Sequence, residues 1–155
     1  MAPVLWLDVT RLVSRAGRGV LTGIDRVEHA WLRHLLGRNH SDTRYILRST
    51  RGYVLLDHRG ASALAAIVMG DRPLGQADLW SRMLGKGSEP RHRVEAVLRP
   101  LAVDRALPAG LSRMIARHAR GAVWYLNTGH SNLSQRTLSG FAQAAGVRVA
   151  VLIMI

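Results

Sequence analysis

The chain has 155 residues, of which 48% are hydrophobic, and a formal net charge of +12. This length and hydrophobic content suit a single folded domain and exclude an intrinsically disordered chain. Cysteine is absent, which excludes disulfides, thiolate metal sites and cysteine nucleophiles. The sequence has neither an apolar run of the roughly 18 residues that a membrane-spanning helix needs nor a secretory signal. The expected location is therefore the cytoplasm, including the inner face of the membrane.

The basic residues are almost all arginine. Lys86 is the only lysine, so 21 of the 22 basic residues are arginines. Such a surface attracts phosphates, acidic membrane surfaces and acidic protein faces in a salt-dependent way. Because the arginines are scattered along the chain and few aromatic residues could stack on bases, we expect no specific nucleic-acid partner. A basic, non-catalytic module that binds nucleic acid or an anionic membrane surface remains the alternative to the function considered below.

The first third of the chain predicts a strand, a loop and a helix. Residues 4–9 form a short apolar run typical of a buried parallel strand. Residues 10–21 combine three arginines with two glycines, a composition that indicates an exposed loop. Residues 22–36 show helical periodicity, with Ile24, Val27 and Leu35 on the apolar stripe and Glu28 among the polar residues off it. Gly37 follows as the expected C-cap.

The remaining elements continue the alternation of strands and helices. The β-prone runs 43–49 and 53–57 indicate either a hairpin or one strand with a continuation. Helical spacing is found in five further segments, and two apolar runs indicate strands. The helical segments are residues 61–69, 76–84, 93–103, 108–118 and, after the next strand, 133–145. The strands are residues 122–126 and 147–155.

The order of these elements predicts an α/β fold, a parallel sheet with helices on both faces. Residues 147–155 are an almost unbroken apolar run, as a central strand covered on both faces requires. Since a domain usually ends in a polar element at its surface, this apolar ending indicates that residues 1–155 form one domain of a longer protein.

Two polar loops follow the carboxyl ends of predicted strands, where open α/β sheets bind ligands. The first loop ends where the helix 22–36 begins, and it could offer backbone N–H groups to an anion or could be a plain helix cap. Asp25 in the first turn of the helix interacts favourably with the helix dipole, and Arg26 can simply be solvated. Neither residue is therefore catalytic by residue type alone. The candidate residues of this loop are Gly19, Thr22, Gly23, Asp25 and Arg26.

The second loop follows the strand 122–126. Its candidate residues are Thr128, Gly129, His130, Ser131 and Asn132. His130 is the candidate catalytic residue: it could be a general base, a donor that orients a sugar hydroxyl, or an ordinary loop residue. The sequence contains no serine nucleophile elbow, no phosphate-binding Walker sequence and no pair of histidines spaced for a metal.

Three segments resemble bacterial glycosyltransferases of the family-four type, which have two Rossmann-like domains in the GT-B arrangement. The first is Asp8-Val9-Thr10-Arg11-Leu12, and the second is Thr22-Gly23-Ile24-Asp25-Arg26-Val27-Glu28. The third runs from Tyr125 through the His130 loop to Leu133, and residues 149–155 resemble the strand that follows it. The middle of the chain carries little of the resemblance.

The resemblance implies a nucleotide-sugar-dependent transferase that retains the anomeric configuration, acts on cell-envelope polysaccharide and uses no cofactor and no metal. Residues 1–155 would be the acceptor-side Rossmann-like domain. In the family, the donor-binding residues belong to a second, C-terminal domain, which these residues do not include, so the chain alone is expected to be inactive. The implied partners are a nucleotide sugar and an acceptor sugar or lipid, with peripheral contact to an anionic membrane. The Gly23 turn would lie near the donor phosphates, with Arg26 in support, and His130 would contact the acceptor.

Overall fold

A computed structural model describes residues 4–85, 87, 89–144 and 146–151. These residues form one six-stranded sheet with the strand order β4-β3-β2-β1-β5-β6. The strands are β1 (Val4–Asp8), β2 (Arg44–Ser49), β3 (Gly52–Leu56), β4 (Ala102–Ala106), β5 (Val123–Asn127) and β6 (Val147–Val151). The α-helices are α1 (Thr10–Arg15), α2 (Gly23–Arg38), α3 (His58–Met69), α4 (Leu79–Met83), α5 (Pro90–Leu98), α6 (Leu111–His118) and α7 (Gln135–Ala142). Two 3-10 turns, η1 (Arg99–Leu101) and η2 (Pro108–Gly110), flank β4.

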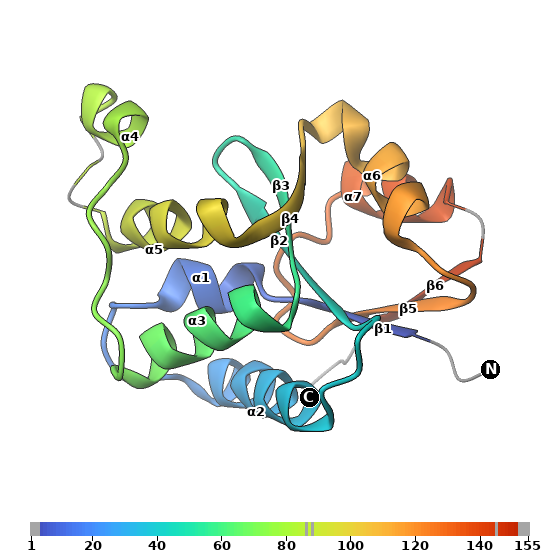
Figure 1. The fold of residues 1–155 in the computed structure, drawn as a ribbon, viewed down its shortest axis with the longest axis horizontal. Helices are drawn as coiled ribbons and strands as arrows, with labels where there is room; N and C mark the ends of the chain where they lie inside the picture. Colours follow the sequence, from blue (N-terminus) through green and yellow to red (C-terminus); the bar gives the residue numbers. More distant parts are fainter. Residues whose placement is uncertain (1–3, 86, 88, 145, 152–155) are drawn as a thin grey trace.

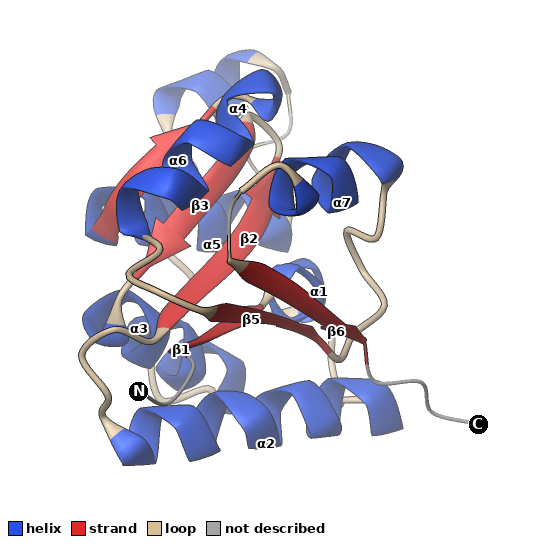
Figure 2. Ribbon diagram, turned by 90° about the vertical axis from the view of Figure 1, so that its right-hand side faces the viewer, coloured by secondary structure: helices blue, strands red, loops and turns tan. Residues whose placement is uncertain are grey.

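Helices cover both faces of the sheet (Figures 1 and 2). The odd residues of β1, such as Leu7, share one apolar core with α1, α2, α3 and α5. The even residues, such as Trp6, share a second core with α6 and α7. This division follows from the two-residue period of a strand, which sends successive side chains to opposite faces. The predicted α/β, Rossmann-like fold with helices on both faces is confirmed.

The strand β1 lies in the middle of the sheet and pairs in parallel with β2 and with β5. The pairing of β5 with β6 is also parallel, whereas β3 pairs antiparallel with both β2 and β4. The runs 43–49 and 53–57 therefore form a hairpin, one of the two predicted alternatives. The sheet is mostly parallel rather than wholly so, because the two-residue turn between β2 and β3 is too short for the crossover that a parallel pairing needs.

Several predicted elements need correction. Residues 10–15 form the helix α1 rather than a loop, because Leu12 and Val13 pack into the core below the arginines. The helix predicted over 93–103 ends at Leu98 as α5, and the following residues turn through η1 into β4. The helix α2 continues past Gly37 to Arg38, and Asn39 in the left-handed conformation is its C-cap.

The strand β6 is an edge strand rather than the predicted central strand. Its Val149 and Val151 side chains are about two-fifths exposed. The predicted continuation of this strand over 152–155 lies outside the described residues.

The apolar stripe predicted for α2 matches its buried face only in part. The helix buries Leu35 as predicted, but it also buries Asp25, Glu28, His29 and Leu32. Val27, on the predicted stripe, is only half-buried. The error has a physical cause: hydrophobic periodicity assumes that buried residues are apolar, and the first half of α2 buries carboxyls that have polar partners.

Candidate functional site at the carboxyl ends of β1 and β5

Asp8, the last residue of β1, is the centre of a buried polar network. Its carboxylate accepts a hydrogen bond from the Thr10 backbone N–H at 2.9 Å, from the Tyr125 hydroxyl at 2.6 Å and from the Asn132 side-chain amide at 3.0 Å. Burial raises the pKa of Asp8 above its ordinary value, although these three donors oppose the shift. The network thus ties the end of β1 to β5 and to the loop that follows it.

The apolar core holds Tyr125 in place for this contact. Its ring stacks on Phe141 with 4.0 Å between the ring centroids, and Trp6 packs edge-on against the same Phe141 at 6.5 Å. All three rings are fully buried. Burial, followed by the charge of Asp8, raises the pKa of Tyr125, so its hydroxyl keeps the proton that it donates to Asp8.

Asn127 and Asn132 shape the second loop. The Asn127 amide donates to the Ser131 carbonyl at 2.6 Å and to the Tyr125 hydroxyl at 3.0 Å. The Asn132 carbonyl oxygen accepts from the Thr137 hydroxyl at 3.0 Å. His130 and Asn132 both have a positive φ, which permits the tight reversal of the chain between them. The loop is therefore held from inside by amide side chains.

Glu28 of α2 is a second buried carboxyl at the same end of the sheet. It is 1% exposed, and its Oε1 atom accepts a hydrogen bond from the Leu12 backbone N–H at 3.3 Å. Among the described residues, its Oε2 atom has no hydrogen-bond partner. Burial, reinforced by the charge of Asp8, raises the pKa of Glu28 well above its ordinary value. A carboxyl in this setting holds a proton at pH values where an exposed glutamate has lost it.

The second loop packs directly on the first segment. A Cβ atom added at Gly129 would overlap the Glu28 Oε2 atom and lie 2.9 Å from the Arg11 Cβ atom. The glycine therefore permits a close approach between the loop after β5, the helix α1 and the helix α2. Thr128, next to it, is fully buried, and within the described residues its hydroxyl has no hydrogen-bond partner. The two segments meet at one edge of the sheet.

Asp25 occupies the start of α2. Its carboxylate accepts from the backbone N–H and the hydroxyl of Thr22 at 2.8 and 2.6 Å, and it pairs with Arg11 at 2.7 Å and Arg15 at 3.5 Å. The contacts with Thr22 and Arg11 outweigh burial and lower the pKa of Asp25. The expected N-cap role of Thr22 is confirmed. The chain's own carboxylate thus already occupies part of the predicted anion site.

Most of the other predicted site residues are exposed. Gly23 is exposed, and a Cβ atom there would have no neighbour within 4 Å, so a ligand could approach its backbone. Gly19 and Arg26 are exposed, and His130 lies exposed at the tip of the second loop. Ser131 is half-buried, with its hydroxyl 3.5 Å from the Gly129 carbonyl. We call these residues the rim, and we call Asp8, Glu28 and the half-buried Asn132 the floor.

Sequence reasoning did not identify Asp8, Arg11, Glu28, Tyr125 and Asn127 as site residues. A signal was present for two of them, because Asp8 and Asn127 are polar residues at the ends of apolar runs. Glu28 carried no such signal, since a glutamate between Val27 and His29 is ordinary on an exposed helix face. Its burial depends on the long-range contact with Gly129.

Comparisons with protein-family models, with curated proteins and with solved structures found no match. Within the described residues, no helix is both long and apolar enough to cross a membrane. A search of the same residues for three clustered His, Asp or Glu side chains that could hold a metal ion also found none.

Proposed function

We propose that residues 1–155 are the acceptor-side, Rossmann-like domain of a nucleotide-sugar-dependent glycosyltransferase that retains the anomeric configuration. One observation carries the proposal. The third segment that resembles family-four glycosyltransferases is far from the first two in the chain, yet it meets both at one edge of the sheet through the contact of Gly129 with Glu28 and Arg11. This edge holds the carboxyl ends of β1 and β5, where α/β sheets bind ligands.

In this proposal, the rim residues contact the substrates and the buried residues hold the rim in position. His130 lies at the tip of a loop that Asn127 and Asn132 fix from inside, so its imidazole can accept a proton from an acceptor hydroxyl or orient that hydroxyl. The exposed backbone at Gly23 lies beside the positive charges of Arg11 and Arg15, and a donor diphosphate would approach there.

Glu28 and Asp8 act through the loop rather than on the substrate. Gly129 covers the Glu28 carboxyl, and both carboxyls are at most 2% exposed. The pKa values of both carboxyls are raised, so a protonated or fully hydrogen-bonded carboxyl is favoured at each position. Such a group can lie beneath a substrate cleft without placing uncompensated charge in the cleft. We therefore assign them as positioning residues.

The experiment is a turnover assay on the product of the whole gene, including any sequence beyond Ile155. The protein is incubated with a panel of UDP-, GDP- and ADP-sugars together with membrane and polysaccharide acceptors, and nucleoside diphosphate release is measured. The proposal predicts acceptor-dependent release by the whole product and none by residues 1–155 alone. Binding of duplex DNA or anionic vesicles that persists at high salt, without any release, would favour the basic binding module instead.

A further inference from the structure

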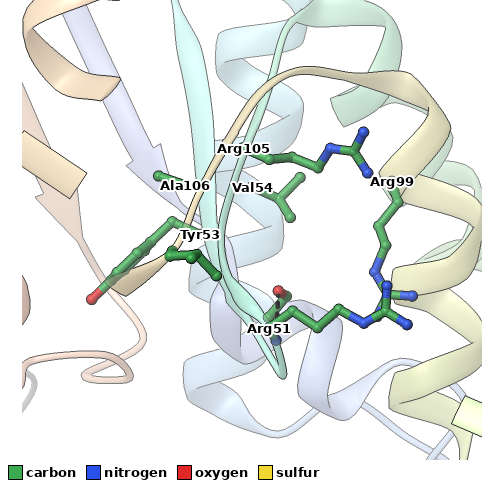
Figure 3. Close-up of a pocket in the computed structure, with 8 residues that line it drawn as sticks. Arg51, Tyr53, Val54, Arg99, Arg105 and Ala106 are labelled. Atoms are coloured by element: carbon green, nitrogen blue, oxygen red, sulfur yellow. Dashed lines mark hydrogen bonds between the residues drawn. The ribbon is translucent and has the colours of Figure 1, made fainter. Parts of the chain in front are cut away.

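A cavity of about 230 Å³ lies at the same end of the sheet but away from the site described above. Arg51, Arg99 and Arg105 line it together with Val54 and the backbone of β4. Figure 3 shows that the side chains of Arg51 and Arg105 extend toward Arg99 across the cavity, while Tyr53 points away from them. Three guanidinium groups from three separate elements therefore surround one small cavity.

The local backbone explains how these arginines come together. Arg51 lies in the turn between β2 and β3, and Gly52 follows it with a φ of 133°. A Cβ atom at Gly52 would overlap the carbonyl oxygen of Ala106, so this glycine lets the turn approach the end of β4. Arg105 stands opposite Val54 in the β3–β4 pairing, which places it on the face that α5 covers. Arg99 extends from η1, directly after α5.

Nearby carboxylates balance only part of this positive charge. Glu95 pairs with Arg91 and Arg99, each at 3.0 Å, and Asp78 pairs with Arg99 and, at 3.7 Å, with Arg51. With Arg105, the cluster holds four guanidiniums against two carboxylates, an excess of two positive charges among the described side chains.

Asp104, the residue before Arg105, does not reduce this excess. Its carboxylate pairs with Arg117 and His118 of α6, each at 2.8 Å, and α6 covers the opposite face of the sheet. Arg99 is 8% exposed, and its burial, followed by the charges of Arg51 and Arg105, lowers its pKa. A guanidinium with two like charges beside it gains from an anion in the cavity.

We propose that the cavity lined by Arg51, Arg99 and Arg105 binds the phosphate group of a phosphate monoester. A dianionic phosphate matches the excess of two positive charges, whereas one carboxylate neutralises only half of it. Guanidiniums converging from three directions suit the several oxygens of a phosphate group, which accept charge-assisted hydrogen bonds on more than one side. The cavity lies at the carboxyl ends of β2 and β4, the edge where such sheets bind ligands. This inference does not depend on the glycosyltransferase proposal.

The test measures binding of inorganic phosphate to the purified chain by calorimetry at low ionic strength. Arg105→Gln removes one guanidinium from an exposed position and leaves the Glu95 and Asp78 pairs of Arg99 intact. Arg113→Gln, an exposed arginine on α6, makes the same charge change on the opposite face and is the matched control. We expect Arg105→Gln to weaken phosphate binding about tenfold or more and Arg113→Gln to change it less than twofold.

Two further arms identify the source of the phosphate. A soluble monoester such as glucose 1-phosphate should compete with inorganic phosphate if the ligand is a small molecule, and vesicles that contain phosphatidic acid should compete if it is a lipid headgroup. Acetate at equal ionic strength should bind at least tenfold more weakly. Equal losses in Arg105→Gln and Arg113→Gln, or acetate binding as tight as phosphate binding, would overturn the proposal, because either result would reflect diffuse attraction to a basic surface.

Discussion

Replacing Gly129 by alanine would place a methyl group against the Glu28 carboxyl and the side chain of Arg11. The carboxyl cannot move aside freely, because Glu28 is buried and accepts the Leu12 N–H at 3.3 Å. Moving the loop instead would stretch the 3.0 Å hydrogen bond from Asn132 to Asp8. Overpacking a core position typically costs about 1–3 kcal/mol, and the smaller entropy of the unfolded alanine chain returns about 0.4–1 kcal/mol. We expect a net loss of about 1–2 kcal/mol.

The matched control is Gly23→Ala, in which the added methyl group meets no atom within 4 Å. This variant should be neutral or more stable by up to about 1 kcal/mol, since alanine is favoured over glycine in a helix. Urea denaturation of the purified variants, followed by circular dichroism, gives both free energies of unfolding. Combining Gly129→Ala with Glu28→Ala should cost less than the sum of the two single changes, because the overlap is relieved. Equal stability of Gly129→Ala and Gly23→Ala would refute the packing of the two segments.

Because the pKa of Glu28 is raised in the folded state, the free energy of unfolding should fall as the pH rises above the ordinary glutamate pKa and through the folded-state pKa. Glu28 contributes at most about 1.4 kcal/mol per pH unit to this fall. Glu28→Gln should flatten this fall in a pH series of urea titrations, and Glu89→Gln, at a half-exposed position, should not. Gly52→Ala should lower the free energy of unfolding by about 1–3 kcal/mol, because Gly52 has a positive φ and lies against the β4 backbone. Gly37→Ala should stabilise the protein, because the added methyl group on α2 meets no atom within 4 Å. Thermal denaturation compares the two variants. Phe141→Ala should cost about 3–5 kcal/mol in the same assay, since its ring is fully buried.

The elements that sequence patterns predicted best are those whose burial is continuous. The strands β1 and β5 are short apolar runs with polar ends, and both were placed within a residue or two. The strand β4 was not predicted, because Asp104 and Arg105 interrupt its hydrophobic pattern. It lies at an edge of the sheet, where charged side chains can reach solvent or partners on helices. Edge strands carry little of the hydrophobic signal on which such predictions depend.

Sequence reasoning selected the two loops of the candidate site but not the buried residues beneath them. The rule that ligands bind at the carboxyl ends of parallel strands selected both loops from the sequence alone. The roles of Glu28 and Asp25 depend on contacts with Gly129 and Arg11. No local pattern predicts such pairings between distant residues, so periodicity placed Glu28 on the wrong face of α2.

The most direct measurement of the central proposal compares His130→Ala with His58→Ala in the product of the whole gene. Both histidines are exposed, but His58 follows the antiparallel β3 and so lies at the opposite edge of the sheet. If His130 acts on the acceptor, His130→Ala should lower nucleotide-sugar turnover by about tenfold to a hundredfold, with a free energy of unfolding within about 0.5 kcal/mol of the unmutated protein. His58→Ala should change neither quantity. Equal turnover in the two variants would contradict the placement of the acceptor site at the loop after β5.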